Sequence, residues 1–198
     1  MTRTLPGGTT LCCTGEGHMT PAERERAIAS LDETRERLLA SVQRLSPSQL
    51  AFKPAPDRWS VAECLEHITV VETSILGAIE KTVRESAAAP PNAQGDVALL
   101  AIVADRTERA KGPERLMPTG RWSHEELFRE FEAARKRTSD FAANTAAPLR
   151  QTGFPHPRFG ALDCYQWLLL IPAHGDRHRA QAEEVMASPG FPRAASAS

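Results

Sequence analysis

The chain has 198 residues, of which 41% are hydrophobic and 25% are charged, and its formal net charge at pH 7 is −1. This length allows one domain with a sizeable core, and the composition is that of a globular protein and not of a disordered one. The near-neutral charge excludes the strongly basic surface that is typical of proteins that bind nucleic acid or anionic membranes, so we expect neither as a partner.

Residues 1–19 lack helical periodicity, and we expect a disordered N-terminal tail there. The run Leu11–Cys13 raises lipid attachment as an alternative. However, Pro6 and the two glycines after it stand where a signal sequence needs an apolar segment. A further alternative is that translation starts at Met19, where the periodic sequence begins.

The first helix is predicted to begin directly after this tail. Thr20 suits the N-cap, Pro21 the first helical position and Glu23 the reciprocal position of a capping box. An apolar stripe follows at helical spacing, while the opposite face is rich in Glu and Arg, as on a solvated surface. The stripe consists of Ile28, Leu31, Leu38, Leu39, Val42 and Leu45.

Two more start signals precede the second long helix. Residues 46–49 predict a single short turn, and the prolines in residues 53–56 force an extended connection. Ser60 and Glu63 then form a capping box, which predicts a helix from about Ser60 to about Ser86. Its apolar positions are Val61, Cys64, Leu65, Ile68, Val71, Ile75, Leu76, Ile79 and Val83.

Residues 87–121 are the least regular part of the chain, with several prolines and glycines. Within them, Val97–Ala104 is apolar, and we expect it to form a short helix or a segment that lines the domain. A capping box over residues 123–126 opens the third long helix. The buried face of this helix is predicted to contain Leu127, Phe128, Phe131, Ala134 and Phe141.

Residues 147–160 are predicted to be a loop, and the last helix to run from about Leu162 to about Ala187. A second disordered tail is expected over residues 189–198. Four long amphipathic segments without a convincing strand predict an all-α fold. We therefore expect a four-helix bundle over residues 20–188, with a long irregular connection between its second and third helices.

Cysteine usage bears on the compartment. The four cysteines contain no CxxC pair, and Cys12 and Cys13 are adjacent, so the chain has neither a disulfide framework nor a thiolate zinc site. The longest apolar run, residues 167–173, is far shorter than the roughly 20 residues of a membrane span. We therefore expect a protein of the reducing cytoplasm.

Two histidines stand on the apolar seam of the last helix. Seam positions recur here at alternating steps of four and three residues, the heptad spacing that faces a bundle core. His174 and His178 occupy two of these positions, four residues apart, so both imidazoles lie on one face, able to share a metal ion. The full seam is Trp167, Ile171, His174, His178, Gln181 and Val185.

A metal ion explains why imidazoles replace apolar residues at these positions. A buried imidazole without a partner costs a few kcal/mol of hydration, and two together cannot both be protonated. His67 also points inward, because Cys64, His67 and Val71 follow the seam spacing of the second long helix. Three nitrogen ligands suit zinc, nickel, iron and other first-row ions, and they leave positions open for water or substrate.

The other candidates have plainer explanations. Cys64 is better explained as a buried core cysteine than as a ligand. Gln181 could hydrogen-bond a metal-bound water, and Glu63 could orient His67, although its capping role already explains it. His156 lies between two prolines, where it could line the mouth of the site, although a surface role is favoured.

Two segments resemble a known family. Residues 58–67 resemble the WS-x-x-E-x-x-x-H segment of the DinB-like proteins, also called the DinB/YfiT-like superfamily. Residues 159–168 and 174–181 resemble the closing segment of that family, with its H-x-x-R-H-x-x-Q pattern. The resemblance covers most of Thr20 to Ala187 and leaves out the N-terminal tail.

The resemblance implies a four-helix bundle, often dimeric, with a three-histidine metal site that matches His67, His174 and His178. Some relatives are transferases that use low-molecular-weight thiols such as bacillithiol or mycothiol, one branch is described as a metal-dependent hydrolase, and many have no known activity. We therefore expect a homodimer with one divalent transition-metal ion, zinc or nickel before iron or manganese.

The expected function is a metal-dependent transferase that acts with a low-molecular-weight thiol on small electrophiles. The alternatives are a metal-dependent hydrolase and a non-catalytic, metal-stabilised dimeric binding module. The expected partner is a small-molecule substrate or thiol. Beyond the three metal ligands, the sequence singles out no catalytic residue.

Overall fold

The structure is a computed structural model that describes residues 17–89, 95–107 and 112–192. Predictions for residues 1–16 and 193–198, which include most of both tails and two of the cysteines, lie outside the described residues. The elements in chain order are α1 (Pro21–Val42), α2 (Pro47–Ala51), α3 (Val61–Arg84), α4 (Asp96–Ala104), the 3-10 helix η1 (Glu114–Leu116), α5 (His124–Asn144), β1 (Gly153–His156), β2 (Gly160–Asp163) and α6 (Cys164–Met186).

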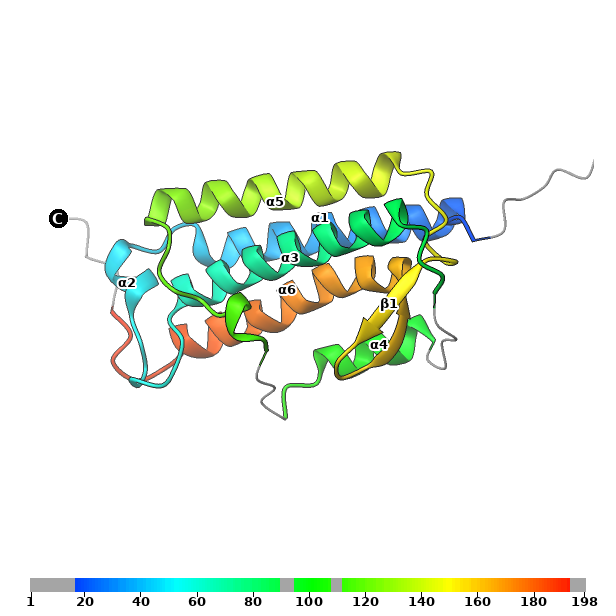
Figure 1. The fold of residues 1–198 in the computed structure, drawn as a ribbon. Helices are drawn as coiled ribbons and strands as arrows, with labels where there is room; N and C mark the ends of the chain where they lie inside the picture. Colours follow the sequence, from blue (N-terminus) through cyan, green and yellow to red (C-terminus); the bar gives the residue numbers. More distant parts are fainter. Residues whose placement is uncertain (1–16, 90–94, 108–111, 193–198) are drawn as a thin grey trace, which may run out of the picture.

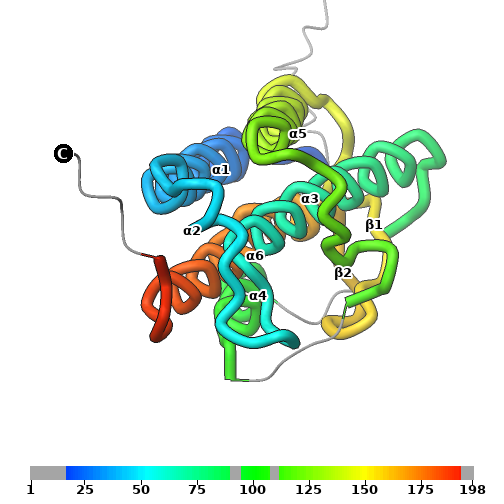
Figure 2. The backbone as a smooth tube through the Cα atoms, turned by 90° about the vertical axis from the view of Figure 1, so that its left-hand side faces the viewer, coloured from blue at the N-terminus to red at the C-terminus, as the bar shows by residue number. Residues whose placement is uncertain are grey.

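Four long helices form the bundle that the amphipathic pattern predicts. α1, α3, α5 and α6 run side by side (Figure 1), and the view along the bundle separates α1 and α5 from α3 and α6 (Figure 2). α3 packs on α5 and α6, and α1 packs on the same two helices. The all-α prediction is therefore confirmed.

Side-chain caps set where the helices begin. At the N-cap, a Ser, Thr or Asp side chain accepts a hydrogen bond from the backbone N–H three residues later, and the side chain of that later residue accepts one from the backbone N–H of the N-cap residue. Four of these five boxes match the predicted starts. The exception is α6, which begins at Cys164, after an N-cap at Asp163 that pairs with Gln166. The N-caps are Thr20, Ser46, Ser60, Ser123 and Asp163.

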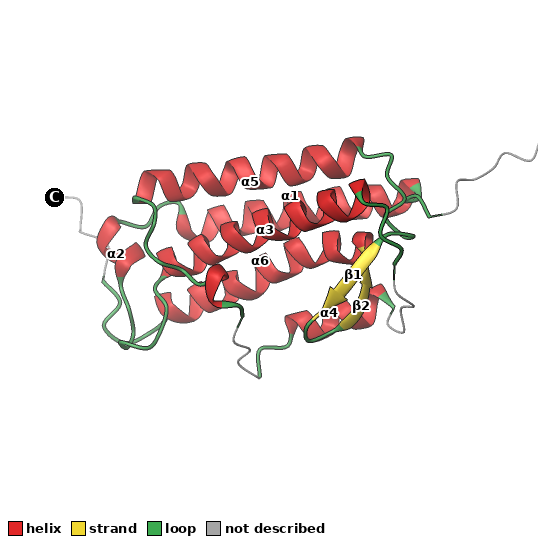
Figure 3. Ribbon diagram, viewed as in Figure 1, coloured by secondary structure: helices red, strands yellow, loops and turns green. Residues whose placement is uncertain are grey.

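A short hairpin occupies the place of a predicted loop. β1 and β2 pair antiparallel, from Gly153 opposite Asp163 to His156 opposite Gly160 (Figure 3). The prediction of a loop over residues 147–160 is wrong here, because two four-residue strands, one of which contains Pro155, carry too little alternation to recognise. Gly153 is required by close packing, since a Cβ atom there would lie 2.3 Å from the carbonyl oxygen of Leu162.

The long connection is only partly irregular. Its apolar stretch forms α4, which packs on α6, as one of the two predicted alternatives states. η1 follows and contacts α3. Within the described residues, no helix is both long enough and apolar enough to cross a membrane.

The described ends of the chain contact the bundle. The carbonyl oxygen of Gly17 accepts a hydrogen bond from the N–H of Arg150 at 2.8 Å. At the other end, the ring of Phe191 packs edge-on against Phe52, and the carbonyl oxygen of Pro192 accepts from the side chain of Gln49.

Candidate metal centre

Three of the six histidines meet between α3 and α6. The ring centroid of His67 lies 5.0 Å from that of His174 and 4.6 Å from that of His178, and the last two are 4.5 Å apart. One ligand nitrogen from each ring lies within 4.8 Å of the others. The structure thus gathers the three histidines that the sequence selects; that they bind metal stays a prediction.

Heptad packing places these side chains. On α6 the seam residues Trp167, Ile171 and Val185 are buried, and on α3 Cys64 and Val71 are buried. The histidines continue the same two seams, so the packing of α3 on α6 turns their rings toward one another. His67 is 5% exposed, while His174 and His178 are half-buried.

Two of the rings are oriented by hydrogen bonds at Nδ1. His67 Nδ1 donates to the carbonyl oxygen of Leu116 at 2.8 Å, and His178 Nδ1 donates to Oε1 of Gln181 at 3.0 Å. Because an oxygen acceptor requires a proton on Nδ1, the lone pair on Nε2 is left free in both rings. Gln181, which the sequence suggested as a partner for metal-bound water, instead orients His178.

All three imidazoles are held in the neutral form that metal ligation needs. Burial lowers the pKa of His67, although its bond to Leu116 opposes the shift. Burial and the neighbouring rings of His178 and His67 lower the pKa of His174 well below its usual value. Burial and His67 lower the pKa of His178 to about 3, against the opposing bond to Gln181.

His174 supplies the sharpest test of whether a metal ion fits. Within the described part of the chain, neither of its ring nitrogens has a hydrogen-bond partner, although its ring is packed between two imidazoles. With metal–nitrogen bonds of about 2.1 Å, tetrahedral ligand atoms stand about 3.4 Å apart, so small side-chain rotations close the present spread. A shared cation would satisfy the ring that otherwise lacks a partner, and the residues therefore fit a metal ion.

No further donor joins this group among the residues that the structure describes. Cys64 is 1% exposed, and burial raises the pKa of its thiol to about 12, so it is a core residue, as the sequence suggested. Glu63 caps α3 and pairs with Lys53 at 2.9 Å, so it does not orient His67. A metal ion held by three nitrogens would keep positions open, as in reactive sites.

An aromatic ring and a loop enclose the cluster. The Trp59 ring lies 4.8 Å from His67 and stacks at 5.7 Å on His178, so it is a wall of the site as well as a packing residue. On another side, η1 brings the carbonyl oxygen of Leu116 to His67. No sequence signal points to Leu116, because its contribution is a backbone atom placed by tertiary contacts.

Glu66 holds the loop after η1 in place, and sequence reasoning missed it. Its carboxylate, 2% exposed, accepts from the backbone N–H of Thr119 at 2.7 Å and of Gly120 at 2.8 Å, and from Arg121 Nε at 2.9 Å. Burial alone would raise the pKa of Glu66, but these donors outweigh it and hold the pKa below its usual value. Glu66 and His67, which are adjacent on α3, therefore both form hydrogen bonds with the segment of residues 116–121.

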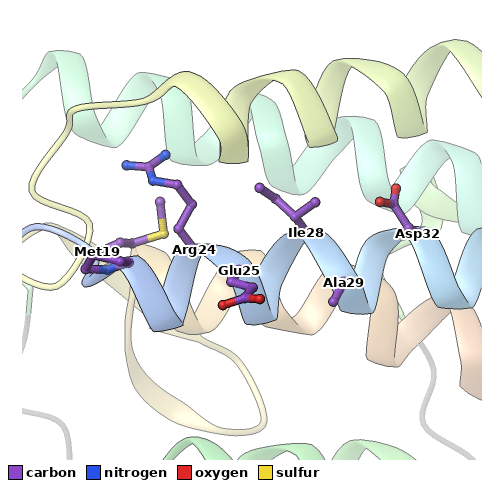
Figure 4. Close-up of a pocket in the computed structure, with 7 residues that line it drawn as sticks. Met19, Arg24, Glu25, Ile28, Ala29 and Asp32 are labelled. Atoms are coloured by element: carbon purple, nitrogen blue, oxygen red, sulfur yellow. The ribbon is translucent and has the colours of Figure 1, made fainter.

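Two surface hollows lie away from the histidines. One follows the start of α1, where Met19, Arg24 and Ile28 are among the lining residues (Figure 4). The other lies between α3 and α5, beside Trp122. Neither hollow is lined by any of the three histidines, so neither is the opening of this site.

Comparison with known proteins connects these features to a family. The model of the DinB superfamily matches residues 30–182, which include all three histidines. The uncharacterized protein YuaE of Bacillus subtilis (strain 168) is 26% identical over 142 residues, which cover 71% of this chain and 85% of that protein.

Two solved structures share the fold. YfiT from Bacillus subtilis is described as a probable metal-dependent hydrolase with an unusual four-helix bundle topology. It aligns with a TM-score of 0.58 at 16% identity, over 88% of this chain and 91% of that one. The four-helix bundle protein TT2238 aligns with a TM-score of 0.51 at 21% identity, over 83% of this chain and 99% of that one.

Proposed function

The chain belongs to the DinB superfamily, and from that premise we propose that His67, His174 and His178 bind one divalent transition-metal ion through Nε2. The observation that supports this most directly is the convergence of three neutral imidazoles, two of which are held with Nε2 free. Zinc and nickel suit an all-nitrogen ligand set best, with iron and manganese as alternatives.

The proposed activity is transfer of a low-molecular-weight thiol to a small electrophile. Held by His67, His174 and His178, a divalent ion would lower the pKa of a bound thiol or water and so would supply a nucleophile at neutral pH. The sulfur forms a bond to the electrophilic carbon, the thiol proton passes to solvent, and the leaving group departs with its electron pair.

The surrounding carboxylates favour a thiol over water as the nucleophile. Attack by water is faster when a general base near the metal removes a proton from it. The nearby carboxylates are already occupied, because Glu66 accepts hydrogen bonds from the loop, and Glu63 accepts one from the N-cap of α3 and pairs with Lys53. Hydrolysis is the second candidate, since the similar fold of YfiT carries the description of a probable metal-dependent hydrolase. For either activity we propose that the partner is a small molecule. We also propose that the protein is a homodimer and that it is cytoplasmic.

The test begins with metal analysis of the purified protein, which should give one divalent ion per chain. His174→Ala should abolish stoichiometric binding, because two imidazoles alone hold such an ion weakly. Transfer of a simple thiol to a chromogenic electrophile should then depend on the metal and stop on chelation. Metal-dependent ester hydrolysis without thiol transfer would favour the second candidate, and unchanged metal binding in His174→Ala would contradict the site.

A further inference from the structure

Trp59 lies against two of the three histidines of the candidate centre. Its ring centroid is 4.8 Å from that of His67 and 5.7 Å from that of His178, and its plane is within 26° of the His178 plane. Among the described residues, neither Trp122 nor Trp167 makes a ring contact with any of the three histidines. Trp59 is therefore the tryptophan that meets the site, and it contacts one candidate ligand on α3 and one on α6.

The start of α3 holds this indole in position. Trp59 directly precedes the N-cap residue Ser60, whose N–H donates to the Glu63 carboxylate at 2.7 Å and whose Oγ accepts from the Glu63 N–H at 3.1 Å. A large side chain just before an N-cap commonly packs back on the first turns of its helix. Trp59 does so, because it packs against the core cluster that contains Cys64. The position of the indole thus follows from the local entry of the chain into α3.

Trp59 meets the histidines with its ring and not with its polar N–H. The residue is half-buried, and its Nε1–H has no acceptor among the described residues. Trp167 differs on both counts, because it is 7% exposed and its Nε1–H donates to the carbonyl oxygen of Phe154 at 2.9 Å. A buried tryptophan usually finds such a partner. The π system is therefore what Trp59 presents to the candidate centre.

Within the described residues, no carboxylate joins the three rings as a candidate ligand or accepts a hydrogen bond from them. His67 Nδ1 donates to the carbonyl oxygen of Leu116 at 2.8 Å. His178 Nδ1 donates to the amide oxygen of Gln181 at 3.0 Å, so both acceptors are neutral, whereas a carboxylate is a common partner of metal-ligating histidines. A divalent ion would therefore spread its charge over these imidazoles without an anion bonded to them. An indole face attracts a cation within about 6 Å of its centroid.

We propose that Trp59 is a positioning residue of the metal centre, whose π system stabilises the charge that a bound divalent ion places on His67 and His178. This inference rests on the proposed function, since it needs a metal ion at the three histidines, and it adds a residue that acts through two of the ligands. The stabilisation belongs to the metal-loaded state, because neutral imidazoles offer the indole no net charge to attract. Trp59 therefore raises the affinity for the metal ion beyond what its packing adds to the folded chain.

The experiment places tryptophan analogues with increasing numbers of ring fluorine atoms at position 59 of the full chain. Each fluorine withdraws electrons from the π face and changes the shape of the ring little. The Kd for zinc, measured by competition with a zinc-sensitive dye, should therefore rise stepwise, to about tenfold. A role in packing alone would not follow the number of fluorine atoms. The same analogues at Trp167, whose ring lies against Phe154 and His156 of the hairpin, are the matched control and should leave the Kd unchanged.

Two variants extend the test. Trp59→Leu should also raise the Kd for zinc about tenfold, and Trp59→Phe, which keeps an aromatic face, should recover part of this loss. The fluorinated proteins keep the test decisive even if Trp59→Leu does not fold. One zinc ion per chain with the same Kd for every analogue at position 59 would overturn the inference and leave the proposed site intact. A wild-type protein that binds no divalent ion would instead contradict the proposed function.

Discussion

At the scale of single residues, the candidate centre depends on neighbours that do not touch the metal position. Glu66 and His67 are consecutive on α3 and face the same loop, one through its carboxylate and the other through Nδ1. Orientation of an imidazole by a hydrogen bond at its far nitrogen fixes which nitrogen faces the metal. Glu66 therefore positions His67 indirectly, by holding the loop that carries the Leu116 carbonyl.

Replacing Glu66 by Gln should weaken metal binding by about tenfold, because an amide cannot accept from all three loop donors and the Leu116 carbonyl loses its fixed place. Competition with a metal-sensitive dye would measure the affinity. Nitrogen-15 spectra of His67 would show a mixture of tautomers, which a general loss of stability does not produce. Glu63→Gln on the same helix is the control, and equal effects of the two variants would refute the role of Glu66.

At the scale of the helices, a buried ion pair joins the bundle at its centre. Arg135 of α5 and Glu72 of α3 are each 2% exposed and pair at 3.0 Å. Arg135 also donates to the carbonyl oxygen of Leu31 and to Thr34 Oγ1, both on α1. One guanidinium thus links three helices, and its position fixes how α5 lies relative to the pair that carries the metal site.

Glu72→Leu should destabilise the protein by about 3–5 kcal/mol, because it leaves a buried cation without its partner. The double variant Glu72→Leu/Arg135→Met should recover most of this loss, since apolar side chains need no compensation in the core. Urea unfolding followed by circular dichroism measures both values. If the single variant costs no more than the double, the pair does not behave as a buried, coupled unit.

At the scale of the whole molecule, a second network ties the outer elements to the bundle. Arg150 pairs with Glu23 of α1, Asp96 of α4 and Asp163 at the start of α6, at 2.5, 2.7 and 3.0 Å. Its guanidinium also lies 4.1 Å from the ring centroid of Tyr165. This one side chain therefore joins α1, α4 and the N-cap of α6.

This network predicts a pH dependence of stability. Burial opposes ionisation of Glu23, but the Thr20 N–H and Arg150 outweigh it and lower the pKa below 4.5. A depressed pKa means that Glu23 stabilises the fold above the unfolded value and loses this effect as the pH falls through the folded value. Glu23→Gln should therefore cost about 1 kcal/mol at pH 7, and this cost should shrink as the pH falls through the folded-state pKa of Glu23. Glu25→Gln is the control, because Glu25 forms no ion pair with the described residues, and its unfolding should show no such pH-dependent difference.

Metal removal should also act on the whole molecule, since the three histidines join α3 to α6. An ion that binds only the folded state stabilises it by about 2.7 kcal/mol at a free concentration one hundred times its Kd. Chelation should lower the Tm of the wild type and leave that of His174→Ala unchanged. A Tm that is insensitive to chelation in metal-loaded wild type would mean that the ion lies elsewhere or does not discriminate between folded and unfolded chains.

Local sequence patterns are enough to predict the long helices and to select the three histidines. Helix starts are local, because a capping box needs only residues three positions apart, and the boxes at Thr20, Ser60 and Ser123 occur where predicted. Inward positions are nearly as local, because heptad spacing orients His174 and His178 whatever the rest of the chain does. The selection of His67 as their companion needed the family resemblance to become specific.

The orientation of these histidines and the groups around them depend on tertiary contacts. The contact of His67 with the Leu116 carbonyl and the contact of Glu66 with the N–H of Thr119 join segments that are distant in sequence, so no local period predicts them. The hairpin of β1 and β2 stands where the sequence predicts a loop, because its strands are short and its pairing depends on packing against α6. Local patterns fix which face a side chain occupies, whereas its partners across the molecule depend on long-range packing that no single segment encodes.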